Sequence, residues 1–141
     1  NRNALFAGGL QPHHYCLPLL KAEHHRRAII SAATSGHPRF FLGTDSAPHA
    51  RAAKESACGC AGIYSAYLAI ELYAQVFERA GCLERLEDFA SRYGAEFYGL
   101  PRNRGSITLE QKDWTVPESL PFGHESVVPL GAGGVCRWRL K

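Results

Sequence analysis

The sequence predicts an α/β fold, in which this chain forms the last part of a larger βα barrel. Residues 39–44 (RFFLGT) form a short, nearly continuous apolar run, which is typical of a strand buried on both faces of a parallel sheet. Helical patterns precede and follow this run, which is the alternation seen in α/β proteins. One buried strand cannot form a parallel sheet alone. We therefore expect its partner strands to lie outside this chain.

The remaining elements follow in order. Glycine, histidine and proline in residues 1–20 predict a loop. The alanine- and isoleucine-rich residues 22–35 predict a helix, which Gly36 is placed to end. After the strand at 39–44, residues 46–62 are rich in Gly, Ala, Pro and Ser and predict a second loop.

The second half of the chain predicts helices followed by strands. Helices are expected over residues 63–93, with Leu68, Leu72 and Val76 recurring at a spacing of four. Apolar and polar side chains then alternate near both ends of residues 106–140, which predicts terminal strands in a small separate sheet. The whole chain is therefore interpreted as one C-terminal piece of a single barrel domain.

Composition narrows the classes of function. The chain has 141 residues, of which 45% are hydrophobic, and this is enough to form a core. The net charge is only +3 and the basic residues are scattered, so neither nucleic acid nor a membrane surface is expected as a partner. No apolar run approaches the ~18–20 residues that cross a bilayer, and a cytoplasmic protein is expected. The chain begins with Asn1 and contains no methionine, and we expect it to be a fragment.

Five cysteines are an odd number, which fits a secreted disulfide framework poorly. Cys58 and Cys60 flank a single glycine, so they are too close to bridge each other easily, and reduced thiols are expected. Together with His13, His14, His24 or His25 they are candidate ligands for a structural zinc, but the usual spacing of two to four residues between paired ligands is missing. The alternative is that the small residues from Cys58 to Gly62 let the backbone approach a ligand closely.

Asp45 lies at the carboxyl end of the predicted strand, where barrel enzymes gather their catalytic groups. The alternative is that Asp45 caps a local turn through Ser46 or the following amides. His49 follows four residues later, after a proline, and either faces solvent or joins Asp45 in a site. The pairs His13-His14 and His24-His25 are expected to be solvated, and Lys54 and Glu55 to form a surface or loop-fixing pair of small net value.

Several motifs together resemble one known family. The segments FLGTDSAPH, KES and CGCAG are preceded by PHHYCLPLLK and followed by EFYGLP. In this combination they resemble the C-terminal part of single-function bacterial dihydroorotases, members of the amidohydrolase superfamily. The resemblance runs over essentially the whole chain.

The resemblance implies a (β/α)8 TIM-like barrel with a two-zinc site. It implies reversible cyclisation of N-carbamoyl-L-aspartate to L-dihydroorotate, a small-molecule reaction of pyrimidine biosynthesis. By the same resemblance, Asp45 binds one zinc and acts as general acid and base. His49 and Ala61 would bind the free carboxylate of the substrate, and Leu17 would contact the substrate through its backbone. The parent enzyme is expected to be a homodimer.

The family's remaining zinc ligands and two further substrate-binding residues have no counterpart in these residues. We therefore expect this chain to be inactive alone. Three alternatives stay open at this point: a dihydroorotase-like scaffold without activity, another amidohydrolase that opens cyclic amides, and an independent zinc-binding module built on the CGC tripeptide.

Overall fold

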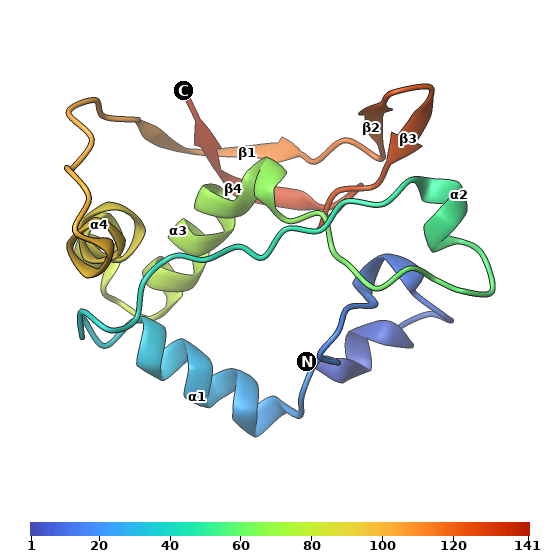
Figure 1. Ribbon diagram of the computed structural model, residues 1–141, viewed down its shortest axis with the longest axis horizontal. Helices are drawn as coiled ribbons and strands as arrows, with labels where there is room; N and C mark the ends of the chain where they lie inside the picture. Colours follow the sequence, from blue (N-terminus) through green and yellow to red (C-terminus); the bar gives the residue numbers. More distant parts are fainter. The chain divides into compact units, whose positions relative to one another are not determined.

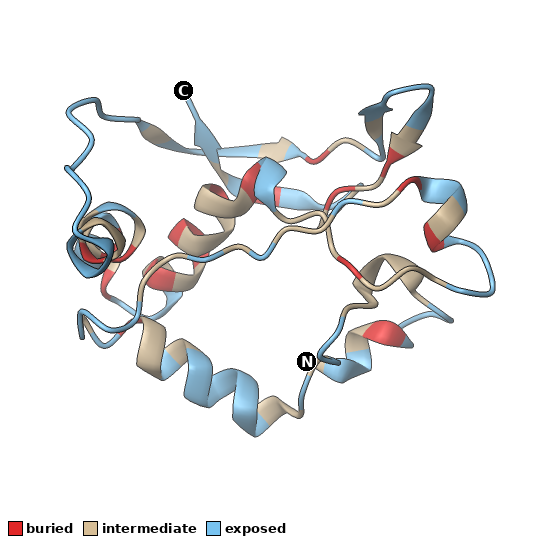
Figure 2. Ribbon diagram, in the orientation of Figure 1, coloured by how far each residue is buried: buried red, intermediate tan, exposed pale blue.

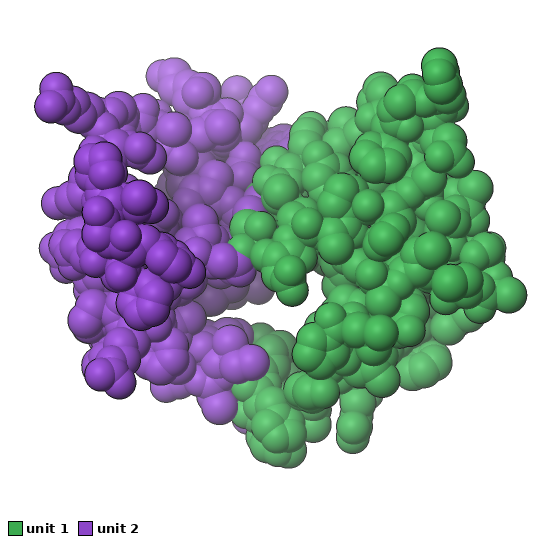
Figure 3. All heavy atoms as spheres, viewed as in Figure 1, with its two compact units in different colours: residues 1–26, 44–68, 115–135 green, residues 27–43, 69–114, 136–141 purple.

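The computed structural model describes all 141 residues, and they divide into two compact units (Figure 3). Unit 1 comprises Asn1–Arg26, Thr44–Leu68 and Thr115–Val135. Unit 2 comprises Arg27–Gly43, Ala69–Trp114 and Cys136–Lys141. Each unit is therefore assembled from three separate stretches of the chain.

The helical elements agree broadly with the sequence pattern (Figure 1). The α-helices are α1 (Glu23–Ala33), α2 (Arg51–Lys54), α3 (Ala69–Arg79) and α4 (Tyr93–Tyr98). Single 3-10 turns occur at Arg2–Leu5, Pro12–His14, Ala66–Leu68 and Leu83–Arg85, and a π-helical turn at Asp88–Arg92. The predicted helix at 22–35 is confirmed as α1, while the predicted loops at 1–20 and 46–62 contain short helical turns. None of the helices has the length and apolar character needed to cross a membrane.

Residues 39–44 form no strand within this structure, contrary to the prediction. A strand is defined by a ladder of hydrogen bonds to a neighbour, and this segment has no neighbouring strand in the chain. Its backbone hydrogen bonds are isolated and form no ladder. Leu42 N–H donates to Phe89 O at 3.0 Å, Phe40 N–H donates to His37 O, and Thr44 O accepts from the Ser65 hydroxyl. That the segment is the last strand of a barrel stays a prediction.

The strands form two two-stranded sheets. One pairs β1 (Leu109–Thr115) with β4 (Val135–Leu140). The other is an antiparallel hairpin of β2 (Leu120–Phe122) and β3 (Glu125–Val127), which turns through Gly123 at φ 63°. Glycine suits this turn because it adopts positive φ without steric cost. The predicted terminal strands are confirmed, although the first begins at Leu109.

The core of unit 2 forms where α3 packs against the segment that follows it (Figure 2). It consists of Ala74, Phe77, Cys82, Leu86 and Phe89. The Phe77 and Phe89 rings lie 5.1 Å apart between centroids, within the range of favourable aromatic pairs.

The predicted apolar face of α3 is only partly right. Leu68 is buried, but Leu72 and Val76 are only half-buried. Two polar residues are buried instead because they contact β4: Glu71 Oε1 accepts from Leu140 N–H at 3.3 Å, and Gln75 Nε2 donates to the Cys136 sulfur at 3.3 Å. A partner for these side chains on β4 offsets the cost of burying them.

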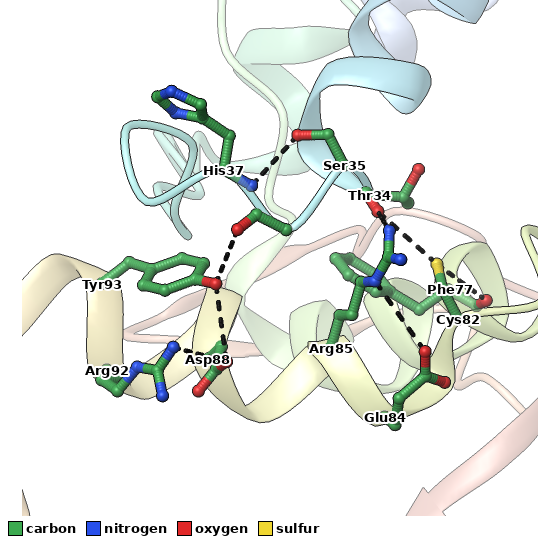
Figure 4. A network of polar contacts seen from close by, with 11 residues as sticks. Thr34, Ser35, His37, Phe77, Cys82, Glu84, Arg85, Asp88, Arg92 and Tyr93 are labelled. Carbon is green, nitrogen blue, oxygen red and sulfur yellow. Dashed lines mark hydrogen bonds and ion pairs between the residues drawn. The ribbon is translucent and has the colours of Figure 1, made fainter.

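The C-terminal end of α1 is held by side chains from the helical segment 82–93 (Figure 4). A helix leaves its last carbonyls without partners inside the helix. Here Arg85 Nη1 donates to Thr34 O at 2.8 Å, and the Tyr93 hydroxyl donates to Gly36 O at 2.7 Å. These bonds fix the turn between α1 and residues 37–43.

Unit 1 has its own buried apolar residues, among them Leu68, Val116, Val127 and Pro129. Tyr64 pairs with Pro129 through an isolated parallel bridge, and Leu130 N–H donates to Tyr64 O at 2.8 Å. Helix α2 contacts β3 in the same unit. These contacts support the loops on which the candidate site lies.

The unit 2 core gives a stability prediction. Phe77→Ala removes a fully buried ring and should lower the free energy of unfolding by about 3–5 kcal/mol, measured by urea denaturation of the 141-residue chain. Phe97→Ala is the matched control, because Phe97 is 64% exposed. Its loss should be about 1 kcal/mol or less, and equal losses for the two variants would contradict the assigned core.

Candidate functional site

All four residues that the sequence nominates lie in unit 1. Asp45 and His49 belong to the extended segment before α2, Ala61 to the loop after α2, and Leu17 to the segment that follows the 3-10 turn Pro12–His14. The structure brings His49 and Ala61 into direct contact. Asp45 and Leu17 are exposed, and neither touches the His49–Ala61 pair through a hydrogen bond.

Asp45 adopts an unusual backbone conformation, with φ 44°. Its carboxylate is exposed and has no hydrogen-bond or ion-pair partner in the chain. The local bonding is done by its neighbour, since Ser46 Oγ accepts from the backbone N–H groups of Ser65 at 3.1 Å and Ala66 at 3.0 Å. Ser46 therefore anchors this segment to residues 65 and 66, and the Asp45 carboxylate caps no turn and is left available for another partner.

Cys60 shares this property with Asp45. They are the only non-glycine residues in the chain with positive φ, and Cys60 has φ 30°. Such conformations cost energy, persist only where surrounding contacts enforce them, and concentrate at functional sites. Here both lie within four residues of His49 or Ala61 along the chain. The strained backbone therefore coincides with the residues that the motifs single out.

His49 Nε2 lies 3.1 Å from Ala61 O. A carbonyl oxygen only accepts, so Nε2 must carry a proton in this contact and Nδ1 is the second site of the ring. Gly62 permits the arrangement. A Cβ at Gly62 would lie 2.5 Å from Ala47 O and 2.8 Å from His49 Cδ2. Only a residue without a side chain lets these two backbone segments approach so closely.

Lys54 is the main feature that the sequence interpretation missed. The sequence predicts a surface or loop-fixing pair with Glu55, but Lys54 is 3% exposed and bonds to other partners. Its Nζ donates to three backbone carbonyls: Tyr15 O at 2.9 Å, Cys60 O at 2.7 Å and Gly62 O at 2.8 Å. An ammonium group has three N–H donors, so all of them are used.

Lys54 thereby joins two loops that are distant in sequence. The Tyr15 carbonyl also accepts from Gly62 N–H at 2.9 Å, so the segment before Leu17 is bonded directly to the loop that holds Ala61. Burial lowers the pKa of Lys54 from its usual value, and the nearby sulfurs of Cys60 and Cys16 act against this shift when they are charged. The three carbonyl dipoles also favour the charged form, since a neutral amine would leave one of them without a donor.

A second link between the same segments lies at the surface. Glu55 does not pair with Lys54; its Oε1 accepts from His13 Nε2 at 3.0 Å and from Arg51 Nε at 2.8 Å. His14 Nδ1 contacts Ala4 O at 3.0 Å. The expectation that His13 and His14 are merely solvated is therefore wrong, because the loop folds back and gives each a partner.

The five cysteines are free thiols, and Cys58 and Cys60 lie 4.0 Å apart between sulfurs. Nowhere in the 141 residues do three His, Cys, Asp or Glu side chains gather in a way that could hold a metal ion. A structural zinc needs four ligands. The independent zinc module built on CGC therefore has no support in the structure.

A cavity of about 540 Å³ lies elsewhere in unit 1. Its wall is mostly apolar, and none of the four candidate residues lines it. The cavity is therefore distinct from the candidate site. The lining residues are Arg2, Leu5, Phe6, Leu10, Gln11, Pro12, Tyr15, Leu19, Leu20, Lys21, Ser56, Ala57, Cys58 and Gly59.

Comparison with known proteins relates the whole chain to one family, although no family model matches it. It is 66% identical over 140 residues to a dihydroorotase of Laribacter hongkongensis and 64% identical over 140 residues to one of Nitrosococcus oceani. The chain matches the C-terminal portion of dihydroorotases. Each alignment covers 99% of the chain but 41% of the relative, so the chain spans about two-fifths of the length of these dihydroorotases.

Solved dihydroorotase structures agree with this match. The chain superposes on a Saccharomyces cerevisiae dihydroorotase, solved in complex with 5-fluoroorotic acid, with a TM-score of 0.89 and 35% identity. A Campylobacter jejuni dihydroorotase gives a TM-score of 0.85 and 31% identity. These superpositions cover 100% and 99% of the chain and 40% of each solved chain. The arrangement of elements described above is therefore similar to that in the matching part of these two solved dihydroorotases.

The residues that support the site were harder to find from sequence than the site residues. In the sequence Lys54 lies beside an acidic residue in a predicted loop, and nothing in that pattern indicates burial. The role of Gly62 was indicated only indirectly, because the run of small residues from Cys58 to Gly62 predicts that the backbone can approach a ligand closely. Ser46 appeared only as a possible partner of Asp45, whereas its partners lie 19 and 20 residues away.

The contact at Gly62 gives the first prediction for the site. Gly62→Ala should push Ala47 and His49 aside and lower the free energy of unfolding by about 1–3 kcal/mol. It should also shift the His49 ring resonances in a ¹H–¹⁵N spectrum. Gly105→Ala is the control, because a Cβ there meets nothing within 4 Å. Unchanged His49 resonances in Gly62→Ala would contradict the close approach.

The Glu55 contacts give a pH prediction. The hydrogen bond from His13, and then that from Arg51, holds the pKa of Glu55 below its usual 4.5. The folded chain therefore binds a proton at Glu55 less readily than the unfolded chain, so the stabilisation is present above about pH 4.5 and is lost as the pH falls through the lowered pKa.

The pH prediction is tested with Glu55→Gln. The difference in melting temperature between the unmodified chain and this variant should be largest above pH 4.5 and should shrink on acidification. Glu110→Gln, at an exposed position on β1, serves as control. A difference that stays constant with pH would show that Glu55 acts through contacts other than its charge.

Proposed function

We propose that this chain is the C-terminal part of a zinc-dependent dihydroorotase with a (β/α)8 barrel, which interconverts N-carbamoyl-L-aspartate and L-dihydroorotate. Identity of 66% to a named dihydroorotase over 140 residues is the observation that supports this most. In unit 1, an unpaired carboxylate, a histidine and a fixed backbone loop lie in the stretch 45–62 where the family motifs occur. The substrate is a small molecule in this proposal, and nucleic acid is not a partner.

The donor set in this chain fits part of a zinc site. Asp45 offers an exposed carboxylate with no competing partner, and carboxylate oxygens are accepted zinc ligands. One carboxylate cannot hold two zinc ions, so other ligands must come from outside these residues. When bound, zinc would lower the pKa of a water molecule and polarise the amide carbonyl under attack.

Asp45 would move the proton in this reaction. In ring opening, its carboxylate accepts the proton of the attacking water and then gives it to the departing amide nitrogen. In ring closure, the same carboxylate takes the proton from the amide nitrogen and returns it. The exposed position of Asp45 and its lack of an internal partner leave both oxygens accessible for these transfers.

His49 and Ala61 would bind the free carboxylate of the substrate. The Ala61 N–H has no acceptor within the chain, and His49 Nδ1 is not used by the contact with Ala61 O. When Nδ1 is protonated, both groups can donate charge-assisted hydrogen bonds to a carboxylate. The backbone of Leu17, which is likewise free of hydrogen bonds in the chain, would contact the substrate from the joined loop.

A chimera tests the proposal. Residues 1–141 replace the matching C-terminal portion of the Laribacter hongkongensis dihydroorotase, and hydrolysis of dihydroorotate and zinc content are measured. Asp45→Asn should lower kcat by about 10²–10⁴-fold, because it removes the proton acceptor. His49→Ala should raise KM with little change in zinc content. The 141-residue chain alone should show no turnover.

Two results would contradict the proposal. A chimera that binds zinc but does not open dihydroorotate would indicate a scaffold or an enzyme for another cyclic amide. Equal loss of zinc and of substrate binding in His49→Ala would show that His49 is not primarily a carboxylate-binding residue. Assembly of the parent protein into a homodimer stays a separate prediction, which the mass of the chimera in solution would test.

A further inference from the structure

The backbone around Ala61 is held at every peptide unit. The unit between Cys60 and Ala61 is fixed through Cys60 O, and the unit between Gly62 and Ile63 through Gly62 O, both by Lys54 Nζ. The unit between them is fixed at both ends, because Ala61 O accepts from His49 and Gly62 N–H donates to Tyr15 O.

This pattern leaves the Ala61 N–H as an unused donor in the loop and sets its direction. In a trans peptide the C=O and N–H bonds of one unit point in opposite directions. Because Cys60 O points at the ammonium of Lys54, the Ala61 N–H of the same unit points away from it. A ligand acceptor can therefore approach this N–H from the side that Lys54 does not occupy.

The bonds made by Lys54 also account for the strained conformation of Cys60. A positive φ at a non-glycine residue needs contacts that enforce it. The hydrogen bond from Lys54 to Cys60 O is the shortest of the three, at 2.7 Å. Without it, the peptide that carries the Ala61 N–H could rotate to relieve the strain.

We propose that Lys54 is a positioning residue for substrate binding: its buried ammonium orients the Ala61 N–H, and with it the His49 contact, toward the free carboxylate of the substrate. The proposal rests on the proposed function for the identity of the ligand. Lys54 itself touches no substrate in this arrangement, because all three of its N–H groups are bonded to backbone carbonyls. Its effect should therefore fall on substrates that carry the carboxylate.

The first test measures orientation without any activity. In the 141-residue chain, Lys54→Met should raise the amide hydrogen-exchange rate of Gly62 about tenfold or more, because the Tyr15 carbonyl loses its second anchor. The Ala61 amide resonance should also shift. Lys112→Met, at an exposed position on β1, is the matched control and should change neither. Unchanged exchange at Gly62 in Lys54→Met would overturn the proposal.

The second test uses ligands that differ by the carboxylate. In the chimera, Lys54→Met should weaken binding of orotate about tenfold and leave binding of uracil, which lacks the carboxylate, unchanged. KM for dihydroorotate should rise more than kcat falls. Equal weakening of orotate and uracil would show general support of the fold and would overturn the positioning role.

Two further points separate the possible failures. If Lys54→Met does not fold, Lys54→Gln keeps two N–H donors and should give a smaller shift in the same direction. If the unmodified chimera has no dihydroorotase activity, the proposed function is wrong, while the exchange result still decides whether Lys54 orients the loop. If the chimera is active and orotate binds Lys54→Met as tightly as the unmodified protein, only the positioning role is wrong.

Discussion

The ammonium of Lys54 bonded to three backbone carbonyls is the interaction on which unit 1 depends. A buried charge without partners would be too costly to keep, and these three acceptors satisfy it completely. Because the acceptors belong to two loops separated by more than forty residues, the lysine fixes the loops to each other as well as to α2. These bonds hold the loop in the conformation that includes the positive φ of Cys60, the close approach of Gly62 to Ala47, and the contact of His49 with Ala61.

In two places, a residue with a free functional group lies next to residues whose hydrogen bonds anchor the backbone. Asp45 keeps a free carboxylate while Ser46, next to it, makes the hydrogen bonds that anchor the segment. Ala61 keeps a free N–H while Cys60 and Gly62, on either side, make the bonds that hold it. In both places the group proposed to contact the substrate, the Asp45 carboxylate or the Ala61 N–H, has no hydrogen-bond partner within the chain.

Sequence patterns predicted α1 and the terminal strands, because these depend on local periodicity. The motifs nominated the four candidate residues, whose roles stay predictions. The sequence patterns failed for Lys54 and for residues 39–44, for opposite reasons. Lys54 is buried because its ammonium bonds to carbonyls 6, 8 and 39 residues away, and no local periodicity indicates such contacts. Residues 39–44 have the composition of a buried strand, but a strand exists only beside a partner, and this chain supplies none.

The left-handed conformation of Asp45 has a consequence for which substitutions the position can accept. Glycine and asparagine adopt positive φ readily, whereas valine or isoleucine would force the segment to rearrange. At position 45, the carboxylate that the proposed reaction needs and the backbone conformation that the fold needs are therefore separate requirements. A homologue that lost the activity could carry asparagine or glycine at position 45 and keep the loop conformation. The residue at this position therefore distinguishes a homologue that has lost only catalysis from one whose loop can no longer fold in the same way.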